Sequence, residues 1–220
     1  MLTRLRRYLS YLVPLTRTVT SPINGPLKVT WHRGRKVLDT RHANYSYGSL
    51  QRVLRYGLLF VAPAVAGRIL LLGLGGGSVV ETLRQEYPAA GHLTAVELDP
   101  AMIGLADTEF GIRPGTDLTI VCADAFEWVR EASAAVFGLV IIDLFIDLDL
   151  PAGLQTADFW QHVWRLLQPG GQVLFNTLTA TPLYVDNQEL TAYLETLGFG
   201  VKEVEVEVLN RLLVLQKPSG

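Results

Sequence analysis

The residues of this chain with the clearest chemical potential are a glycine cluster and an acidic residue that follows it. Gly73, Gly75 and Gly77 come directly after the apolar run 69–72, and Glu97 lies about twenty positions further on. A glycine turn between a strand and a helix presents unpaired backbone N–H groups, and an acid at this distance can accept hydrogen bonds from ribose hydroxyls. The pattern predicts a nucleotide site, and the alternative is a packing turn beside a solvated Glu97.

Further acids follow the next two apolar runs. Asp124, with Ala125 beside it, follows the run 117–122 and could accept a hydrogen bond from the adenine amine or simply cap the next helix. Asp143 directly follows the apolar run 137–142, where a carboxylate could hold a cationic amine or remove its proton. Asp147 lies in the acidic loop that comes next and could also hold a substrate amine. The alternative is that this loop is a solvated surface segment.

Two tyrosines precede the helix expected over residues 51–60. Tyr45 and Tyr47 alternate with small polar residues. This segment is either a surface turn or a lid that carries a phenol toward a substrate in the nucleotide site. We therefore keep Tyr47 as a candidate catalytic residue that orients the nucleophile, and Tyr45 as a candidate substrate contact.

The elements that must position these residues form an α/β pattern. Short apolar runs alternate with helical stretches, which predicts a doubly wound, mostly parallel sheet with its ligand crevice at the carboxyl ends of the strands. The expected strands are 69–72, 92–96, 117–122, 137–142 and 172–176. Residues 201–208 and 211–216 predict a closing antiparallel hairpin, whereas NAD-binding sheets usually end in a parallel strand.

The first fifty residues have a different character and are expected to form an extension, followed by a nucleotide-binding domain over 51–220. Residues 1–13 predict a basic amphipathic helix that packs on the body or on a partner subunit, or else lies on a membrane surface. The Pro-, Gly-, Ser- and Thr-rich segment 16–26 predicts a linker. Residues 27–31 and 36–39, on either side of Arg33 and Gly34, predict a small β-hairpin.

Composition narrows the function classes. The net charge is −2, which argues against a nucleic-acid scaffold. The four histidines are scattered, so no metal site is expected. The sequence contains no run of about eighteen apolar residues, so no membrane-spanning helix is expected. A single cysteine, Cys122, suggests a reducing compartment, and we expect a cytoplasmic protein.

Together these motifs resemble the spermidine synthase-like branch of the class I S-adenosylmethionine-dependent methyltransferases. The resemblance covers residues 27–217, including Pro169-Gly170-Gly171 and the terminal hairpin. It implies a seven-stranded Rossmann-like sheet and a bound S-adenosylmethionine or its decarboxylated form. By the roles of that family, Gly73, Gly75 and Gly77 line the sulfonium nucleoside, Glu97 binds its ribose, Asp124 and Ala125 bind adenine, Asp143 deprotonates the attacking amine, and Tyr47 matches the family's lid tyrosine. A homodimer is also implied, because the N-terminal hairpin resembles one that joins subunits in the family.

The chain departs from that family at the amine-binding residues. Spermidine synthases carry Gly-Gly-Gly-Asp-Gly after the first strand, and here the sequence is Gly75-Gly76-Gly77-Ser78-Val79. The family's Asp-x-x-Asp pair becomes Asp143 followed by Leu144, Phe145 and Ile146, with Asp147 one place late. The sequence therefore favours methyl transfer to a small amine or hydroxyl acceptor. The alternatives are aminopropyl transfer, a non-catalytic nucleoside-binding relative, and an NAD-dependent oxidoreductase.

Overall fold

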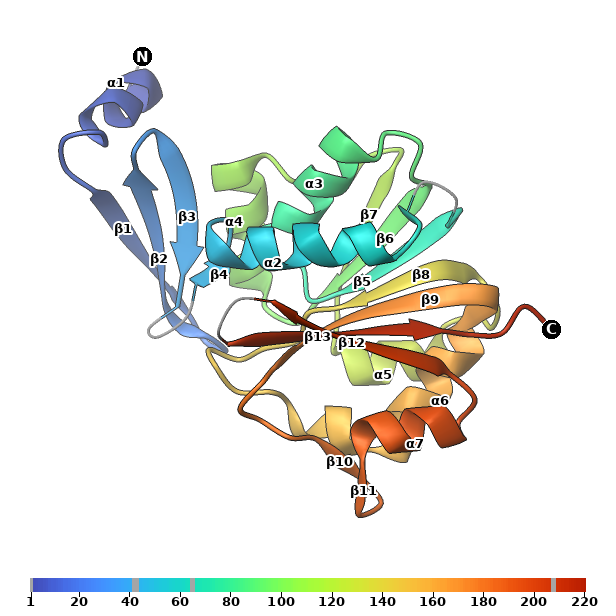
Figure 1. Cartoon of the computed structure of the whole chain (residues 1–220). Helices are drawn as coiled ribbons and strands as arrows, with labels where there is room; N and C mark the ends of the chain where they lie inside the picture. Colours follow the sequence, from blue (N-terminus) through green and yellow to red (C-terminus); the bar gives the residue numbers. More distant parts are fainter. Residues whose placement is uncertain (1, 41–43, 64–65, 207–208) are drawn as a thin grey trace.

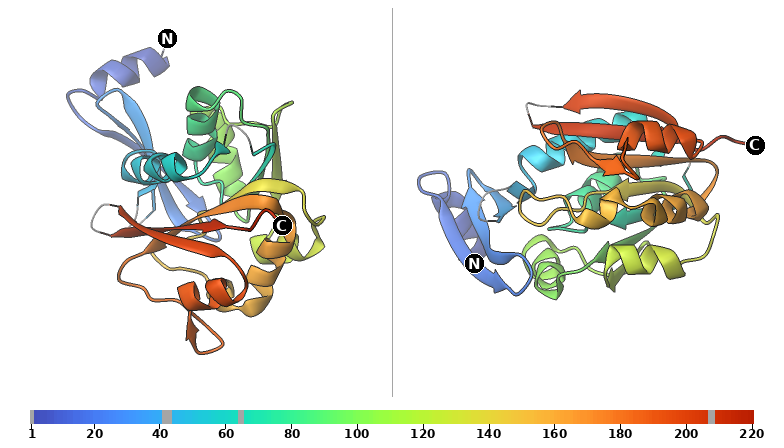
Figure 2. Two further views of the ribbon diagram at one scale, coloured as in Figure 1. Left: turned by 45° about the vertical axis from the view of Figure 1, so that its right-hand side comes forward. Right: turned by 90° about the horizontal axis from the view of Figure 1, so that it is seen from below.

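The computed structural model describes residues 2–40, 44–63, 66–206 and 209–220, together with the side chains of residues 5–40, 46–63, 66–206 and 209–220 (Figure 1). A seven-stranded sheet runs through the body of the molecule with helices on both faces, and a smaller sheet projects at the N-terminal end (Figures 1 and 2). In spatial order the large sheet contains β12 (Gly200–Val206), β13 (Asn210–Gln216), β9 (Leu167–Leu178), β8 (Phe137–Ile142), β5 (Arg68–Leu72), β6 (His92–Glu97) and β7 (Leu118–Cys122).

The large sheet is parallel except at one strand. β9, β8, β5, β6 and β7 pair in parallel, and β13 runs antiparallel to both β9 and β12. This confirms the doubly wound, mostly parallel seven-stranded sheet and its closing antiparallel hairpin. A parallel sheet covered on both faces needs apolar side chains at consecutive positions, and every residue of β8 is buried.

Alternation along the central strand divides the core into two layers. Leu70 and Leu72 of β5 face one cluster of buried side chains, and Ile69 and Leu71 face the other, because successive side chains of a strand point to opposite faces. The first layer is covered by α5 (Ala125–Glu131), η3 (Ala152–Gln155), α6 (Ala157–Leu166) and α7 (Leu190–Thr196). The second is covered by α2 (Ser49–Gly57), η1 (Leu58–Phe60), α3 (Ser78–Glu86) and α4 (Pro100–Phe110).

The N-terminal extension is a four-stranded antiparallel sheet and not a hairpin on a linker. Its strands are β1 (Leu15–Ser21), β2 (Gly25–His32), β3 (Arg35–Asp39) and β4 (Asn44–Ser46). The hairpin around Arg33 and Gly34 is confirmed, and both turn residues have positive φ. The linker prediction for 16–26 is wrong, because the Thr- and Val-rich part of this segment pairs along its whole length with β2. β-branched side chains favour a strand over residues 16–20, and the turn-forming residues that follow make the tight turn at 22–24 that joins β1 to β2.

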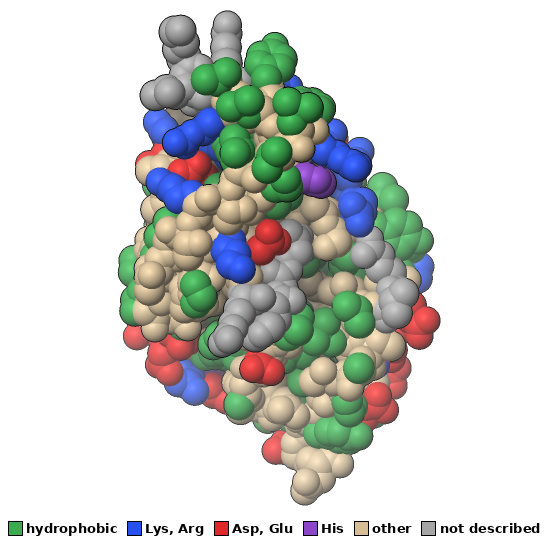
Figure 3. Space-filling model, turned by 90° about the vertical axis from the view of Figure 1, so that its left-hand side faces the viewer, with side chains coloured by type: hydrophobic (Ala, Val, Ile, Leu, Met, Phe, Trp, Pro, Cys, Tyr) green, Lys and Arg blue, Asp and Glu red, His purple; other side chains and the backbone are tan. Residues whose placement is uncertain are grey.

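The helix α1 (Leu2–Leu9) is joined to the tip of this sheet. The backbone N–H of Arg33 donates to the carbonyl oxygen of Ser10, and the Gly34 N–H donates to the Ser10 hydroxyl at 2.9 Å. The apolar side chains expected to pack on the body are instead exposed, with Leu5, Leu9 and Leu12 at 56%, 43% and 82%. Figure 3 shows hydrophobic side chains beside Lys and Arg on this end of the molecule.

A short two-stranded hairpin, β10 (Tyr184–Val185) and β11 (Gln188–Glu189), directly precedes α7. Within the described ranges, every helix is too short or too polar to cross a lipid bilayer.

Candidate functional site

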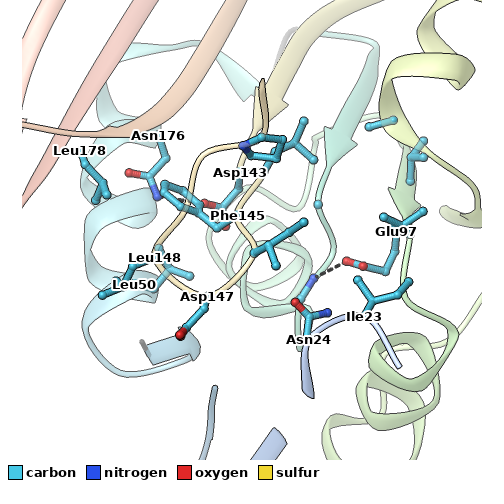
Figure 4. A pocket seen from close by; sticks show the side chains of 18 of the residues that line it. Ile23, Asn24, Leu50, Glu97, Asp143, Phe145, Asp147, Leu148, Asn176 and Leu178 are labelled. Atoms are coloured by element: carbon cyan, nitrogen blue, oxygen red, sulfur yellow. Dashed lines mark hydrogen bonds between the residues drawn. The ribbon is translucent and has the colours of Figure 1, made fainter. Parts of the chain in front are cut away.

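A cleft of about 300 Å³ opens at the carboxyl ends of the parallel strands, where a doubly wound sheet places its ligands (Figure 4). Its walls come from the glycine turn after β5, the ends of β6 and β8, the start of α5, the loop 144–151 and the β1–β2 turn. Of the residues predicted from sequence, the cleft is lined by Gly73, Gly75, Glu97, Asp124, Ala125, Asp143 and Asp147.

The glycine turn brings its backbone against the end of β8. Gly73 has a φ of 91°, and a Cβ atom at this position would lie 2.2 Å from the carbonyl oxygen of Asp143. Only glycine fits here, because both the backbone conformation and the space exclude a side chain. Gly75 also lines the cleft, whereas Gly77 is the N-cap of α3 and is not among its lining residues.

Glu97 ends β6 and holds the glycine turn in place. One carboxylate oxygen, Oε2, accepts from the backbone N–H groups of Leu74 and Gly75 at 3.0 and 3.1 Å, and Oε1 accepts from the N–H of Asp99 at 3.0 Å. Burial raises the pKa of Glu97, and these three backbone donors oppose that rise. A carboxylate has about four acceptor positions, so one remains for a ligand hydroxyl beside the three amides.

Asp124 performs the structural role that the sequence left open, and it lines the cleft as well. Its Oδ1 atom accepts from the backbone N–H of Phe126 at 2.7 Å and of Glu127 at 3.3 Å, which makes it the N-cap of α5. Both bonds use the same oxygen, so Oδ2 can accept from a ligand amine. Ala125 is buried beside it and gives the cleft a flat apolar wall.

Asp143 lies between the two sides of the cleft and is held by two asparagines. The Nδ2 atom of Asn176, at the end of β9, donates to Asp143 Oδ1 at 2.9 Å. The Nδ2 atom of Asn210, from β13, donates in turn to Asn176 Oδ1 at 3.0 Å. Burial raises the pKa of Asp143 to about 6, while the Asn176 bond lowers it and the nearby Glu97 charge raises it. A carboxylate with such a pKa is suited to accept a proton near neutral pH.

The remaining predicted site residues are Asp147, Tyr47 and Tyr45, and only Asp147 is among the residues that line the cleft. Asp147 lines the cleft in a tight turn, and its Oδ1 accepts from the Thr40 hydroxyl of the small sheet. Tyr47 does not line the cleft. Its ring stacks on Phe110 with centroids 4.4 Å apart, and its phenol is hydrogen-bonded to Glu81, an arrangement that together with burial raises its pKa. Tyr45 lies in β4, and its side chain is outside the described part of the structure.

Sequence reasoning missed the contribution of the β1–β2 turn. Ile23 and Asn24 line the cleft near Glu97, and the fully buried Asp99 anchors them (Figure 4). Asp99 Oδ2 accepts from the Ser21 hydroxyl at 2.5 Å and from Asn24 Nδ2 at 2.7 Å. The sequence reasoning also missed the contribution of the hydrogen-bonded pair Asn176 and Asn210. An asparagine at the end of the apolar strand next to Asp143 was the available signal.

The charges of the cleft are all of one sign. Glu97, Asp124, Asp143 and Asp147 line it, and its described lining contains no Lys, Arg or His side chain. Negative charge concentrated in a partly enclosed cleft attracts cations. Leu98, which follows Glu97, is 43% exposed in the cleft and offers an apolar surface to a ring. The residues present therefore fit a nucleoside that bears a positively charged sulfur.

Comparison with known proteins shows which proteins this chain resembles. Residues 69–171 match the methyltransferase domain family. The chain is 30% identical over 166 residues to a polyamine aminopropyltransferase of Vibrio vulnificus, an alignment that covers 74% of this chain and 54% of the relative. The chain thus spans about half the length of that relative.

Two solved structures show the same fold. Spermidine synthase from Thermotoga maritima has a TM-score of 0.67 and 17% identity, with 93% of this chain and 73% of that chain covered. Human methyltransferase-like protein 13 in complex with SAH has a TM-score of 0.61 and 20% identity, with 77% and 82% covered. The matched methyltransferase domain, the similarity to a polyamine aminopropyltransferase and the fold shared with spermidine synthase together support a place for this chain in the spermidine synthase-like branch of the class I S-adenosylmethionine-dependent methyltransferases.

Proposed function

We propose that this chain is a transferase that moves a carbon group from a sulfonium nucleoside to an amine, and that aminopropyl transfer is the first candidate reaction. The observation that carries the proposal is the cleft with four carboxylates and no basic side chain in its described lining, because both a sulfonium and an ammonium group are cations. The curated relative with 30% identity is a polyamine aminopropyltransferase, and this favours aminopropyl transfer over the methyl transfer that the sequence favoured.

The donor is S-adenosylmethionine or its decarboxylated form, and when bound it supplies an electrophilic carbon attached to positively charged sulfur. Gly73 and Gly75 would lie beside the sulfonium nucleoside, Glu97 would accept from its ribose, and Asp124 with Ala125 would contact its adenine. These roles use the acceptor positions that the hydrogen bonds to backbone amides leave open on Glu97 and Asp124.

Asp143 would prepare the acceptor. An ammonium group that enters the cleft must lose a proton before its nitrogen can attack carbon, and Asp143 is the carboxylate whose pKa, about 6, suits this transfer. The bond from Asn176 fixes the orientation of the carboxylate, so that its other oxygen can face the amine. The remaining contribution of the protein is to hold the nitrogen in line with the carbon–sulfur bond.

Methyl transfer is the second candidate, and one feature favours it. Ser78 stands where spermidine synthases carry the aspartate of the glycine motif, and its hydroxyl cannot replace that carboxylate as a partner of an aminopropyl ammonium group. Tyr47, the proposed lid tyrosine, also points to Glu81 and away from the cleft in this arrangement. Asp147 and Tyr45 stay as predicted acceptor contacts.

Two sulfonium donors tested in parallel distinguish these reactions. The chain is incubated with S-adenosylmethionine or with its decarboxylated form and a panel of amines, and release of the thioether nucleoside is measured. Release from the decarboxylated donor alone supports aminopropyl transfer, and release from S-adenosylmethionine alone supports methyl transfer. Calorimetry that shows nucleoside binding without any product would support the non-catalytic relative, and the absence of binding by both donors would refute the proposal.

A matched pair of variants assigns the base. Asp143→Asn should abolish turnover and keep nucleoside binding. Asp149→Asn, an exposed residue of the same loop that does not line the cleft, should leave both unchanged. Full activity of Asp143→Asn would remove Asp143 from the proposed mechanism.

A further inference from the structure

The cleft has two chemically different ends. Glu97, Ile23 and Asn24 lie together at one end, and Leu50, Leu148 and Leu178 lie together at the other, with Asp143 and Asn176 beside the second group (Figure 4). The first end contains the acid proposed to bind ribose and therefore belongs to the donor. The second end is where an acceptor nitrogen would have to approach Asp143.

The acceptor end is mostly hydrocarbon. Phe145 and Leu209 complete the wall that Leu50, Leu148 and Leu178 begin. Two of these side chains remain in contact with solvent, with Leu148 48% exposed and Leu209 64% exposed. Apolar side chains that gather at the mouth of a cleft mark a surface on which an apolar part of a ligand is buried.

The loop after β8 lines the cleft, but it directs the carboxylate of Asp147 away from Asp143. Ile146 and Asp149 exchange two backbone hydrogen bonds of 3.0 Å, which close a tight turn with Asp147 and Leu148 at its tip. Asp147 has a φ of 56°, and its carboxylate accepts from Thr40 of the small sheet. Figure 4 shows this carboxylate directed away from Asp143, and it shows Leu148 near Leu50.

This geometry bears on the charge of the acceptor. A diamine whose first nitrogen is at Asp143 would bring its distal ammonium group against the leucines of the described lining, and partial removal of a cation from water by apolar side chains is unfavourable. A monoamine with an alkyl or aryl substituent would bury that substituent against the same side chains with a gain in free energy.

We infer that the acceptor is a primary amine that carries an apolar substituent, an inference that rests on the proposed transferase function. A carbon–nitrogen bond forms as the carbon–sulfur bond breaks, and the electron pair of the broken bond remains on sulfur in the neutral thioether nucleoside. The acceptor enters as an ammonium ion and gives one proton to Asp143, which passes it to solvent. The nitrogen that then attacks carbon takes over the positive charge of the sulfonium, so the product leaves as a secondary ammonium ion beside the neutral thioether nucleoside.

A series of acceptors tests the inference with whichever sulfonium donor supports turnover. Ethylamine, butylamine and hexylamine are compared with putrescine, and release of the thioether nucleoside is the measurement. We expect KM to fall about fourfold for each added methylene group, because each buries about the same apolar area. Hexylamine should then have a kcat/KM at least about tenfold above that of putrescine. A preference for putrescine, or a KM independent of chain length, would overturn the inference and leave the proposed function standing.

Two exposed leucines provide matched variants. Leu148→Asp should weaken the dependence on chain length and move the preference toward putrescine, because it places a carboxylate at the acceptor end. Leu12→Asp changes a residue that follows α1, far from the cleft, and that is 82% exposed. It should alter neither the dependence of KM on chain length nor the preference between hexylamine and putrescine. If no amine of either kind leads to release of nucleoside, the proposed function and the inference fail together. Calorimetry then shows whether the sulfonium donor still binds at the end of the cleft near Glu97.

Discussion

If the proposed transferase function holds, the hydrogen bond from Asn176 to Asp143 should set the pH at which the protein becomes active. Asn176 is fully buried, and its amide donates to the carboxylate at 2.9 Å. Leucine has nearly the same shape and no donor, so Asn176→Leu removes the bond with little change in volume. Because this bond lowers the pKa of Asp143, its loss should raise that pKa above its value of about 6.

The size of the shift follows from the strength of the bond. A hydrogen bond to a charged group contributes about 1.5–3 kcal/mol, and 1.36 kcal/mol corresponds to one pKa unit. The pKa of Asp143 in the variant should therefore be about 7 to 8. The ionised fraction at pH 7 would fall from about nine-tenths to between about one half and one tenth, so kcat/KM should fall about two- to tenfold at pH 7 and recover near pH 9.

The pH dependence of kcat/KM checks this expectation. The acidic limb should have its midpoint near pH 6 in the native chain and one to two units higher in Asn176→Leu. A ¹³C NMR titration of the Asp143 carboxyl carbon gives the same quantity without turnover. Asn210→Leu is the control, because it removes only the outer bond of the pair and should move the midpoint much less. An unchanged midpoint in Asn176→Leu, by both methods, would refute the reasoning.

Three further predictions concern stability. Because burial raises the pKa of Asp143 from 3.8 to about 6, its ionised form destabilises the fold as pH rises from about 4 to about 6. Asp143→Asn should therefore increase the free energy of unfolding in urea by up to about 3 kcal/mol at pH 7.5 and by almost nothing at pH 4, and equal effects at both values would contradict this. Gly73→Ala should cost at least about 2 kcal/mol, whereas Gly111→Ala, which also has positive φ but open space around it, should cost about 1 kcal/mol in the same measurement. Ser21→Ala should lower stability by about 1–3 kcal/mol, because it leaves the buried Asp99 with one donor fewer; a variant as stable as the native chain would show that Asn24 and Ala101 suffice.

Local sequence patterns were sufficient to predict the large sheet and the acids at its edge. The run before Asp143 is apolar at every position, which is the pattern of a strand buried on both faces, and the carboxyl end of such a strand lies at the ligand crevice. The same argument placed Glu97 and Asp124 at the cleft. These predictions needed only periodicity and chain order.

The parts that could not be predicted depend on contacts between distant segments. Ser21 and Asp99 are separated by 78 positions, and nothing in either segment indicates that they meet. Residues 16–26 carry both β-branched residues and turn-forming residues, so the pairing with β2 decided between strand and linker. Tyr47 could have faced the cleft or the body, and stacking on Phe110 with a bond to Glu81 directs it to the body. The sequence predicts Asn176 only as a residue of a strand. Its hydrogen bond to Asp143 could not be predicted, because Asp143 follows a different strand.

The attachment of the β1–β2 turn to Asp99 has a practical consequence for anyone who shortens the gene. The boundary that the sequence suggests at residue 50 would separate Ile23 and Asn24 from the rest of the cleft that they line. A fragment of residues 51–220 would keep every strand of the large sheet but expose Asp99 and the donor end to bulk water. Such a fragment should release nucleoside faster than the intact chain, so low affinity measured on it would reflect the truncation and not the native protein.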